Sequence, residues 1–433
     1  MAIKTLSFVF AAVLAGSAVA APKIQQWQTA NGARVLFVQA PEIPMVDAQV
    51  VFDAGSVRDL AKPGIAVMTN ALLNEGAGDK NADAIAEQFA ALGARQGNSA
   101  DRDIAYFSLR SLTDPAMLQP AAELLALILK QPSFPQDAFE RVQNNALVGL
   151  QAQKQAPDEI TSEAFFKALY GTHPYASHPN GNEASLKALT VADLKAFYKQ
   201  YYVARNAMVA IVGALERADA EKLANILVSG LPEGAAAAKL PEVTELAAAN
   251  VIKLSHPSTQ SHVMLGQPGI RRTDADYFAL YIGNHILGGN GLVSRISDEI
   301  REKRGLSYSA YSYFMPMRER GPYILGLQTR ADKTDEAIKV LRDTLEKFVK
   351  DGPTTKEFEA SKKNITGGFA LRVDSNKKIA DYLAVIGFYN LPLDYLDTFI
   401  ARINAVTLQQ VKDAFKRRVD PGKLVTVIVG KQG

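Results

Sequence analysis

A long gapless internal repeat constrains the fold of this chain more than any other feature. Residues 189–213 read LTVADLKAFYKQYYVARNAMVAIVG, and residues 406–430, which begin 217 positions later, read VTLQQVKDAFKRRVDPGKLVTVIVG. In each copy, a threonine suited to capping a helix, Thr190 or Thr407, precedes helical apolar spacing. Each copy then ends in a β-branched strand that closes on glycine. A match of this length predicts two homologous domains in tandem.

Signals elsewhere in both halves predict an α+β fold. The first half has a hairpin turn at Asn31-Gly32, an alternating strand over 45–52, and a helix from Pro63-Gly64 to about residue 74. The second half has a strand over 262–266 and a helix over about 274–287. Because strands and helices are grouped rather than strictly alternating, we expect each half to be a mainly antiparallel sheet packed against several helices.

The predicted domain boundaries follow from composition. Residues 233–249 are rich in alanine and proline with little periodicity, so they form the expected linker. The first domain would then cover residues 21–232 and the second domain residues 250–433.

Residues 1–20 have the three parts of a secretory signal peptide. Lys4 supplies a positive start, an apolar stretch follows, and Ala18-Val19-Ala20 has the small residues that signal peptidase accepts. The alternative is a buried N-terminal helix. We expect cleavage near Ala20 and a periplasmic or secreted protein, and no later stretch is long and apolar enough for a membrane helix.

Composition removes several classes of function. The 433 residues are 48% hydrophobic, which is enough for two or more cores, and they include no cysteine. The chain therefore has no disulfide, cysteine nucleophile or thiolate metal ligand. A net charge of +3 with no basic run argues against nucleic acid as a partner.

A candidate pair of functional residues lies in the second half, where residues 294–314 read SRISDEIREKRGLSYSAYSYF. The spacing predicts a helix to about Lys303, a stop at Gly305, and a strand from Leu306 onward. This brings Arg301 near Tyr308, and a guanidinium beside a phenol is suited to holding a peptide carbonyl or its oxyanion. The same residues also have an ordinary structural interpretation, since arginine suits a helix C-terminus and tyrosine suits a strand.

The segment over residues 288–312, GGNGLVSRISDEIREKRGLSYSAYS, resembles the C-terminal-domain signature of the pitrilysin/insulinase family of zinc peptidases, which includes the mitochondrial processing peptidases. The tandem repeat fits the same family, so the resemblance covers essentially the whole mature chain. It implies two homologous domains forming a clam-like half chamber. It also implies that Arg301 and Tyr308, and not Arg304, reach a zinc site and support the substrate carbonyl in the transition state.

The other hallmark of that family, H-x-x-E-H on the first long helix, is degenerate here. Two histidines one turn apart bind zinc, and the glutamate serves as general base. In the helix GIAVMTNALLNEG these positions fall at Val67, Asn70 and Ala71, which cannot play those parts. The position of the further ligand falls near Leu147. Glu140 is the nearest carboxylate, and a lone glutamate there is read as a surface group.

Other metal ligands are sparse. No histidine precedes residue 170, and His173 and His178 lie in a proline-containing loop, where they could form an ad hoc site with Glu183. The alternative is a surface loop rich in turns. His285 lies on an apolar helix and is read as a core histidine. We expect this chain to bind no metal or cofactor, with zinc held by a partner.

The first functional hypothesis is a non-catalytic subunit of a heteromeric zinc metallopeptidase, inactive alone. It would bind extended peptides and supply Arg301 and Tyr308 to a homologous partner that carries H-x-x-E-H. The segment 103–112 is a candidate edge strand for peptide pairing, although a central strand fits as well. The second hypothesis is a structural or peptide-binding protein without a peptidase role, like the core subunits of the respiratory cytochrome bc complex. The third is an independent hydrolase with an unrecognised site.

Overall fold

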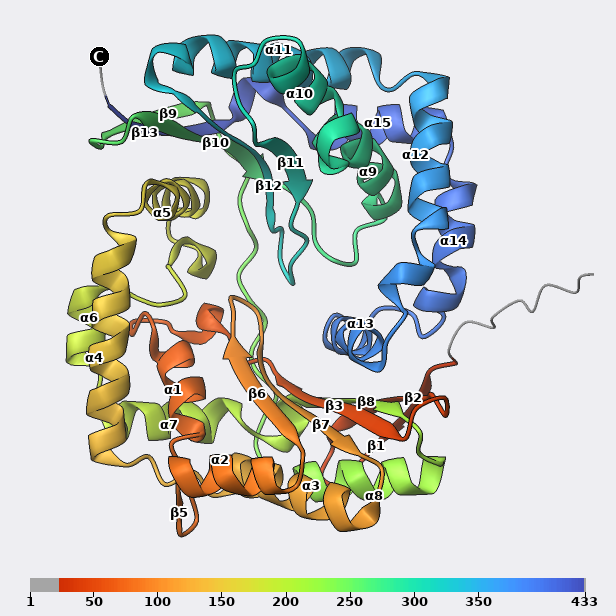
Figure 1. Ribbon diagram of the computed structural model, residues 1–433. Coiled ribbons are helices and arrows are strands. Elements are labelled where there is room, and N and C mark those ends of the chain that lie inside the picture. The colour runs from red at the N-terminus through yellow and green to blue at the C-terminus, as the bar shows by residue number, and fades with distance from the viewer. Residues whose placement is uncertain (1–22, 432–433) are drawn as a thin grey trace, which may run out of the picture.

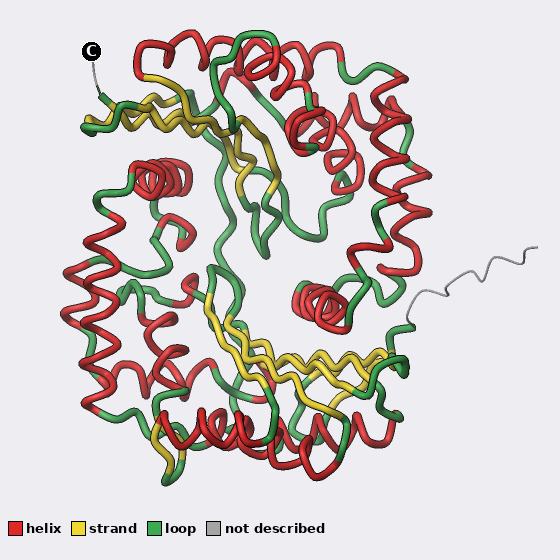
Figure 2. The backbone as a smooth tube through the Cα atoms, in the orientation of Figure 1, coloured by secondary structure: helices red, strands yellow, loops and turns green. Residues whose placement is uncertain are grey.

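The computed structural model describes residues 23–431, so the predicted signal peptide lies outside the described residues. Two separate sheets, one from each half of the chain, are each surrounded by helices (Figure 2). Within the described residues, no helix is both long enough and apolar enough to cross a bilayer.

The sheet of the first half has the strand order β1-β2-β8-β3-β7-β6. Strands β2 and β8 are parallel and the other neighbours are antiparallel. The predicted hairpin at Asn31-Gly32 joins β1 to β2. The bounds of the strands are β1 Gln25–Gln28, β2 Arg34–Gln39, β3 Met45–Phe52, β6 Arg95–Ala100, β7 Ala105–Leu112 and β8 Ala207–Gly213, with a small separate hairpin of β4 Gly76–Ala77 and β5 Lys80–Asn81.

Helices α2, α3 and α8 cover the outer face of this sheet (Figure 1), and α1 and α7 share the same hydrophobic core. The bounds of the helices are α1 Ile65–Leu73, α2 Ala82–Ala91, α3 Pro115–Lys130, α4 Gln136–Gln153, α5 Pro157–Tyr170, α6 Glu183–Ala188, α7 Val191–Tyr201 and α8 Arg217–Val228. Residues 231–249 then run to the second half without a helix or strand, and Leu240 and Val243 within them are buried.

The sheet of the second half has the order β11-β12-β10-β13-β9, and β9 and β13 are the one parallel pair among the described strands of this sheet. Its strands are β9 Asn250–Ser255, β10 Gln260–Pro268, β11 Ala310–Phe314, β12 Pro322–Arg330 and β13 Val425–Gly430. Its helices are α9 Tyr277–Asn284, α10 Arg295–Ser297, α11 Thr334–Asp351, α12 Thr355–Gly367, α13 Asn376–Phe388, α14 Tyr395–Ala405 and α15 Leu408–Arg418. Single π-helical turns, His285–Gly289 and Asp298–Glu302, extend α9 and α10.

The repeat extends far beyond the two segments in which the sequence shows it. Shifting β7 by 217 positions places it on β12, and the same shift takes β6, β3, β8 and β2 onto or close to β11, β10, β13 and β9. The equivalent strands stand in the same order in both sheets. Thr190 and Thr407 each form a complete capping box at the start of α7 and α15. The predicted α+β fold with two homologous halves is confirmed.

The two halves exchange equivalent helices. Helix α13 of the second half packs on the inner face of the first sheet, where Leu383 shares a core with Leu36 and Met208 (Figure 1). Helix α5 of the first half packs on the second sheet, where Phe165 shares a core with Val427. The 217-residue shift carries α5 onto α13. Each sheet is therefore buried on one face by a helix that the other half supplies.

A buried carboxylate ties the two halves together. Asp103 is 3% exposed. Its Oδ1 accepts a hydrogen bond from the Tyr175 hydroxyl at 2.8 Å, and its Oδ2 accepts from the Tyr389 hydroxyl at 2.9 Å and the Arg318 backbone N–H at 2.7 Å. Because donors from both halves satisfy one acceptor, separating the halves would leave a buried polar group unpaired.

Of the two alternatives for the segment 103–112, the central strand is confirmed and the edge strand was wrong. The strand begins at Ala105 rather than Asp103, and β7 pairs with β3 on one side and β6 on the other. The edge strand next to β7 is β6, whose residues 95–100 read RQGNSA. This sequence lacks the β-branched and aromatic residues that signal strands, so it forms a strand through its pairing with β7.

Shortening a side chain of the exchanged helix is expected to destabilise the whole chain. Leu383 on α13 is 0% exposed against the first sheet, so Leu383→Ala should lower the free energy of unfolding by about 2–5 kcal/mol. Urea unfolding followed by circular dichroism should show one cooperative transition at a lower midpoint. The control Leu371→Ala, at a side chain that is 69% exposed, should change little. Two separate transitions for Leu383→Ala would contradict the interlocked arrangement.

The stability of the chain is expected to depend on pH through Asp59, which lies just before helix α1. Asp59 is buried and accepts hydrogen bonds from the backbone N–H groups of Gly64 at 2.6 Å and Ala66 at 3.0 Å. Burial raises the pKa of Asp59 to about 7, although these two hydrogen bonds oppose the rise. A raised pKa means that the folded state binds the proton more tightly, so this contribution to stability is complete below about pH 4 and is lost as the pH rises to 7.

We therefore expect the wild-type free energy of unfolding to fall, relative to that of Asp59→Asn, as the pH rises from 4 to 7. Urea unfolding of both proteins at several pH values in this range measures the difference. A difference that stays constant, or changes in the opposite direction, would contradict the assignment to Asp59.

Candidate functional site

The segment that carries Arg301 and Tyr308 is anchored by buried isoleucines and turned by a glycine. Ile296 and Ile300 are both 0% exposed and hold α10 and its π-helical turn against the second core. Gly305 has a φ of +59°, which glycine adopts readily, and its N–H bonds to the Arg301 carbonyl at 2.9 Å. The chain then reverses and places the Tyr308 ring centroid 5.8 Å from the guanidinium carbon of Arg301.

The predicted strand start was wrong in this segment. The strand begins at Ala310, so Tyr308 lies in the loop before β11 and does not share a strand face with Ser312. The Ser307 hydroxyl donates to the Ser309 carbonyl at 2.8 Å, and the Thr329 hydroxyl donates to the Leu306 carbonyl at 2.6 Å. These bonds hold the loop in place without regular pairing.

Both members of the pair face solvent. The Tyr308 side chain is 90% exposed and that of Arg301 is 35% exposed. Arg301 makes one loose ion pair with Glu302, with 3.5 Å between Nε and Oε1, and an exposed pair of this kind contributes little. Arg304 instead bonds to both the side chain and the backbone carbonyl of Glu299. Arg301 is therefore the better placed of the two arginines to donate to another molecule.

Helix α1 carries the degenerate positions in apolar surroundings. Val67 and Ala71 line a cavity of about 280 Å³ together with Val142 and Ala146 of α4. Asn70 faces the core and is 2% exposed. Its amide oxygen accepts a hydrogen bond from the Asn98 side chain of β6 at 2.8 Å, and its amide nitrogen lies 3.4 Å from the Tyr202 hydroxyl.

These residues do not fit a zinc ion. Valine and alanine offer no lone pair, and Asn70 is occupied in joining α1 to the edge strand β6. Leu147 packs partly buried against the first core, and Glu140 is exposed and accepts a bond from Gln136 at 2.9 Å. Across residues 23–431, no group of three or more histidine, aspartate or glutamate side chains is arranged to hold a metal ion.

The histidine loop does not bring its three candidate ligands together. His173 bonds to the Pro241 carbonyl at 3.0 Å, and His178 faces Glu159 at 3.9 Å. Glu183 pairs with Lys154 and Lys187 on the surface. These three side chains therefore make separate structural contacts and do not form a common metal site.

His285 is only half-buried, so the expectation of a core histidine was wrong in part. Its two ring nitrogens lie 2.9 Å from the Ser361 hydroxyl oxygen and 3.2 Å from the Asn364 amide oxygen. Both ring nitrogens therefore have a partner, although the ring stands at the edge of a cavity.

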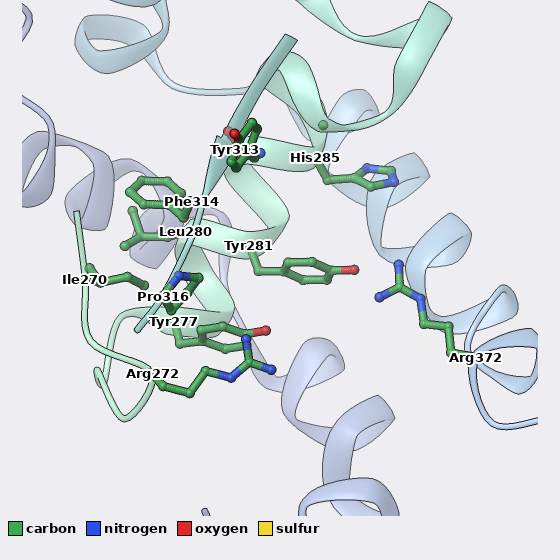
Figure 3. A pocket seen from close by; sticks show the side chains of 12 residues that line it. Ile270, Arg272, Tyr277, Leu280, Tyr281, His285, Tyr313, Phe314, Pro316 and Arg372 are labelled. Atoms are coloured by element: carbon green, nitrogen blue, oxygen red, sulfur yellow. The ribbon is translucent and has the colours of Figure 1, made fainter. Parts of the chain in front are cut away.

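That cavity is a feature that the sequence did not reveal. It measures about 330 Å³ and lies between α9, β11 and the turn Ala370–Arg372. Figure 3 shows Arg272 and Arg372 approaching it from two sides, with Tyr277 and Tyr281 between them. We call it the arginine cavity. The two arginines are one hundred positions apart and belong to no common motif, so no local signal in the sequence links them.

Two family models match successive parts of the chain. Residues 34–181 match the model described as insulinase (peptidase family M16), and residues 188–365 match the model described as the peptidase M16 inactive domain. Among solved structures, the peptidase M16 inactive domain from Pseudomonas fluorescens is 43% identical, with a TM-score of 0.92 over 95% of this chain and 98% of that one.

More distant relatives cover nearly the whole chain. The uncharacterized zinc protease YmxG of Bacillus subtilis is 25% identical, with 90% of this chain and 94% of that protein covered. The non-peptidase homolog YmxG of Helicobacter pylori is also 25% identical, with 92% of each covered. The similarity to an inactive domain and a non-peptidase homolog fits a non-catalytic role. The chain belongs to the M16, or insulinase, family of peptidases.

Proposed function

We propose that this chain is the non-catalytic subunit of a heteromeric zinc metallopeptidase, in which a homologous partner carries the intact H-x-x-E-H motif and the zinc ion. The observation that carries the proposal is the unequal state of the two halves. The half-buried Arg301 and the exposed Tyr308 stand side by side, whereas Val67, Asn70 and Ala71 form apolar or structural contacts. Such a chain can contribute to an active site but cannot complete one.

The contribution of the pair is electrostatic. A guanidinium and a phenol that donate to the carbonyl oxygen of the scissile peptide bond stabilise the negative charge that develops there. Donors of this kind act best when they are held in place before the reaction, and the buried Ile296 and Ile300 hold this segment. Hydrolysis itself would take place at the residues of the partner.

The edge strand β6 is the place where we propose that an extended peptide pairs. Its only neighbour in the described sheet is β7, so its other edge can accept a further strand. Asn98 of β6 bonds to both the backbone and the side chain of Asn70, and this holds the strand against α1. Pairing of this kind reads backbone rather than side chains. We also propose that the protein is exported, on the basis of its first twenty residues.

A purely structural or peptide-binding role is the second candidate. It is favoured by the similarity to a protein described as a non-peptidase homolog. The two candidates differ in whether Arg301 and Tyr308 affect peptide cleavage, so substitution of these residues separates them.

The experiment mixes the mature chain with an M16 homologue from the same organism that bears H-x-x-E-H. Cleavage of a quenched fluorescent peptide and bound zinc are measured for each chain and for the mixture. We expect the lone chain to be inactive and the mixture to be active. Arg301→Ala should lower kcat of the mixture by about 10²–10³-fold, as loss of one oxyanion donor does. Tyr308→Phe, which removes only the hydroxyl, should also lower kcat.

Arg304→Ala is the matched control, because this neighbouring arginine is paired with Glu299 and should leave the activity of the mixture unchanged. A mixture that is active but indifferent to both Arg301 and Tyr308 would favour the structural role. Zinc-dependent cleavage by the lone chain would contradict both candidates.

A further inference from the structure

The arginine cavity has two guanidinium groups supported by aromatic rings. The Cζ of Arg272 lies 5.3 Å from the ring centroid of Tyr277, and the Cζ of Arg372 lies 5.7 Å from that of Tyr281. The two tyrosine rings are parallel, with an angle of 3° between them and centroids 6.1 Å apart (Figure 3). The two tyrosine rings thus lie against the guanidinium groups that line the cavity and help to hold them there.

The positive charge of the cavity is not balanced by the protein. No aspartate or glutamate lines the cavity, and neither Arg272 nor Arg372 has a carboxylate partner within residues 23–431. By contrast, the adjacent Arg271 pairs with Glu319 at 2.6 Å. The Nε of Arg272 is buried without a hydrogen-bond partner, and such a donor costs about 1–3 kcal/mol if it stays unpaired. An anionic ligand in the cavity would balance the charge of the two guanidinium groups, although the buried Nε of Arg272 itself lies out of its reach.

His285 at the cavity edge does not supply a competing charge. Its burial and the nearby positive charge of Arg372 lower its pKa, although a hydrogen bond with Asn364 opposes this. The ring is therefore neutral near pH 7 and is occupied by Ser361 and Asn364. The two arginines alone carry the attraction for an anion.

The position of the cavity follows from the internal repeat. The 217-residue shift carries α1 onto the end of α9 and its π-helical turn, and carries β6 onto β11. The cavity lies beside these counterparts. A hydrogen bond from an asparagine side chain joins helix and strand in each half. In the second half the Asn284 side chain donates to the Ser312 carbonyl of β11 at 2.8 Å, and in the first half the Asn98 side chain of β6 donates to Asn70 of α1. The second half thus has a cavity lined by two arginines beside the equivalent of the helix that carries the degenerate zinc motif.

We propose that the arginine cavity binds a carboxylate of an extended peptide, either its C-terminal carboxylate or an acidic side chain. A guanidinium matches the two oxygens of a carboxylate, and the apolar part of the lining, Ile270, Leu280 and Phe314, suits the remainder of a residue. This inference rests on the proposed function only in that the ligand is a peptide. The cavity would select peptides that carry a carboxylate at the right place, whereas backbone pairing along β6 does not distinguish one side chain from another.

The test measures fluorescence anisotropy of labelled peptides with the full mature chain. Three peptides share one sequence without acidic residues. One ends in a free carboxylate, one ends in an amide, and one ends in an amide but carries a single glutamate near that end. The wild type should bind at least one carboxylate-bearing peptide about 10-fold or more tightly than the plain amide, because a hydrogen bond to a charged group has this effect. The peptide that is preferred identifies the source of the carboxylate.

Arg272→Gln/Arg372→Gln should abolish this preference, and Arg372→Gln alone, at an exposed residue that can change without disturbing the core, should reduce it. Arg330→Gln is the control, because it removes the same charge from an exposed arginine paired with Asp332. It should keep the preference. Circular dichroism checks that each variant is folded.

The outcomes separate this inference from the proposed function. Equal binding of all three peptides by the wild type would overturn the carboxylate site while leaving peptide binding intact. A preference that persists in the double variant would also overturn it. If no peptide binds, the proposed peptide binding fails and the inference fails with it, whereas the effect of Arg301 on cleavage by a mixed pair is measured independently.

Discussion

The exchange of helices α5 and α13 between the two sheets is the interaction on which the rest of the structure depends. The inner strands of both sheets are buried on both faces, as alternate residues of β8 show, because Val209 and Ile211 enter one core and Met208 and Ala210 enter the other. The second face of each sheet is covered by a helix from the other half, since α13 packs on the first sheet and α5 packs on the second. The hydrogen bonds of Asp103 join the same two halves. The sites of the two halves are consequently held in a fixed relation.

The same scaffold carries different chemistry in its two copies. In the first half, the helix next to the edge strand faces an apolar cavity with Val67 and Ala71. In the second half, the equivalent helix borders a cavity with two arginines that have no carboxylate partner among the described residues. Asparagine side chains join helix and edge strand in both copies. The scaffold is maintained by packing and capping in both copies, whereas the two cavities differ in the charge of the side chains that line them.

Much of the fold could be predicted because its determinants are local. The capping threonines and the turn at Asn31-Gly32 are each contained within a few consecutive residues, and the repeat is read directly by aligning two continuous segments of the sequence. The order of strands could not be predicted, because pairing between β6 and β7 joins positions whose propensities do not distinguish an edge strand from a central one. Alternation from Leu306 onward suggested a strand through Tyr308, yet the hydrogen bonds of Ser307 and Thr329 hold that segment as a loop.

For the candidate site too, some features can be predicted from the local sequence and others cannot. The proximity of Arg301 and Tyr308 follows from the helix stop at Gly305, which lies between them, so it can be predicted from the local sequence. The exposure of the pair to solvent cannot be predicted from the local sequence. It has a physical consequence. Tyr308 is 90% exposed and the Arg301 side chain 35% exposed, so water competes for their donors and would weaken the stabilisation of a developing charge that we propose for them. Leu292 and Val293, earlier in the same signature segment, are 60% and 78% exposed, and exposed apolar side chains of this kind are typical of a contact surface. A second protein that covered this segment would exclude the water, and only then would the guanidinium and the phenol act with full strength.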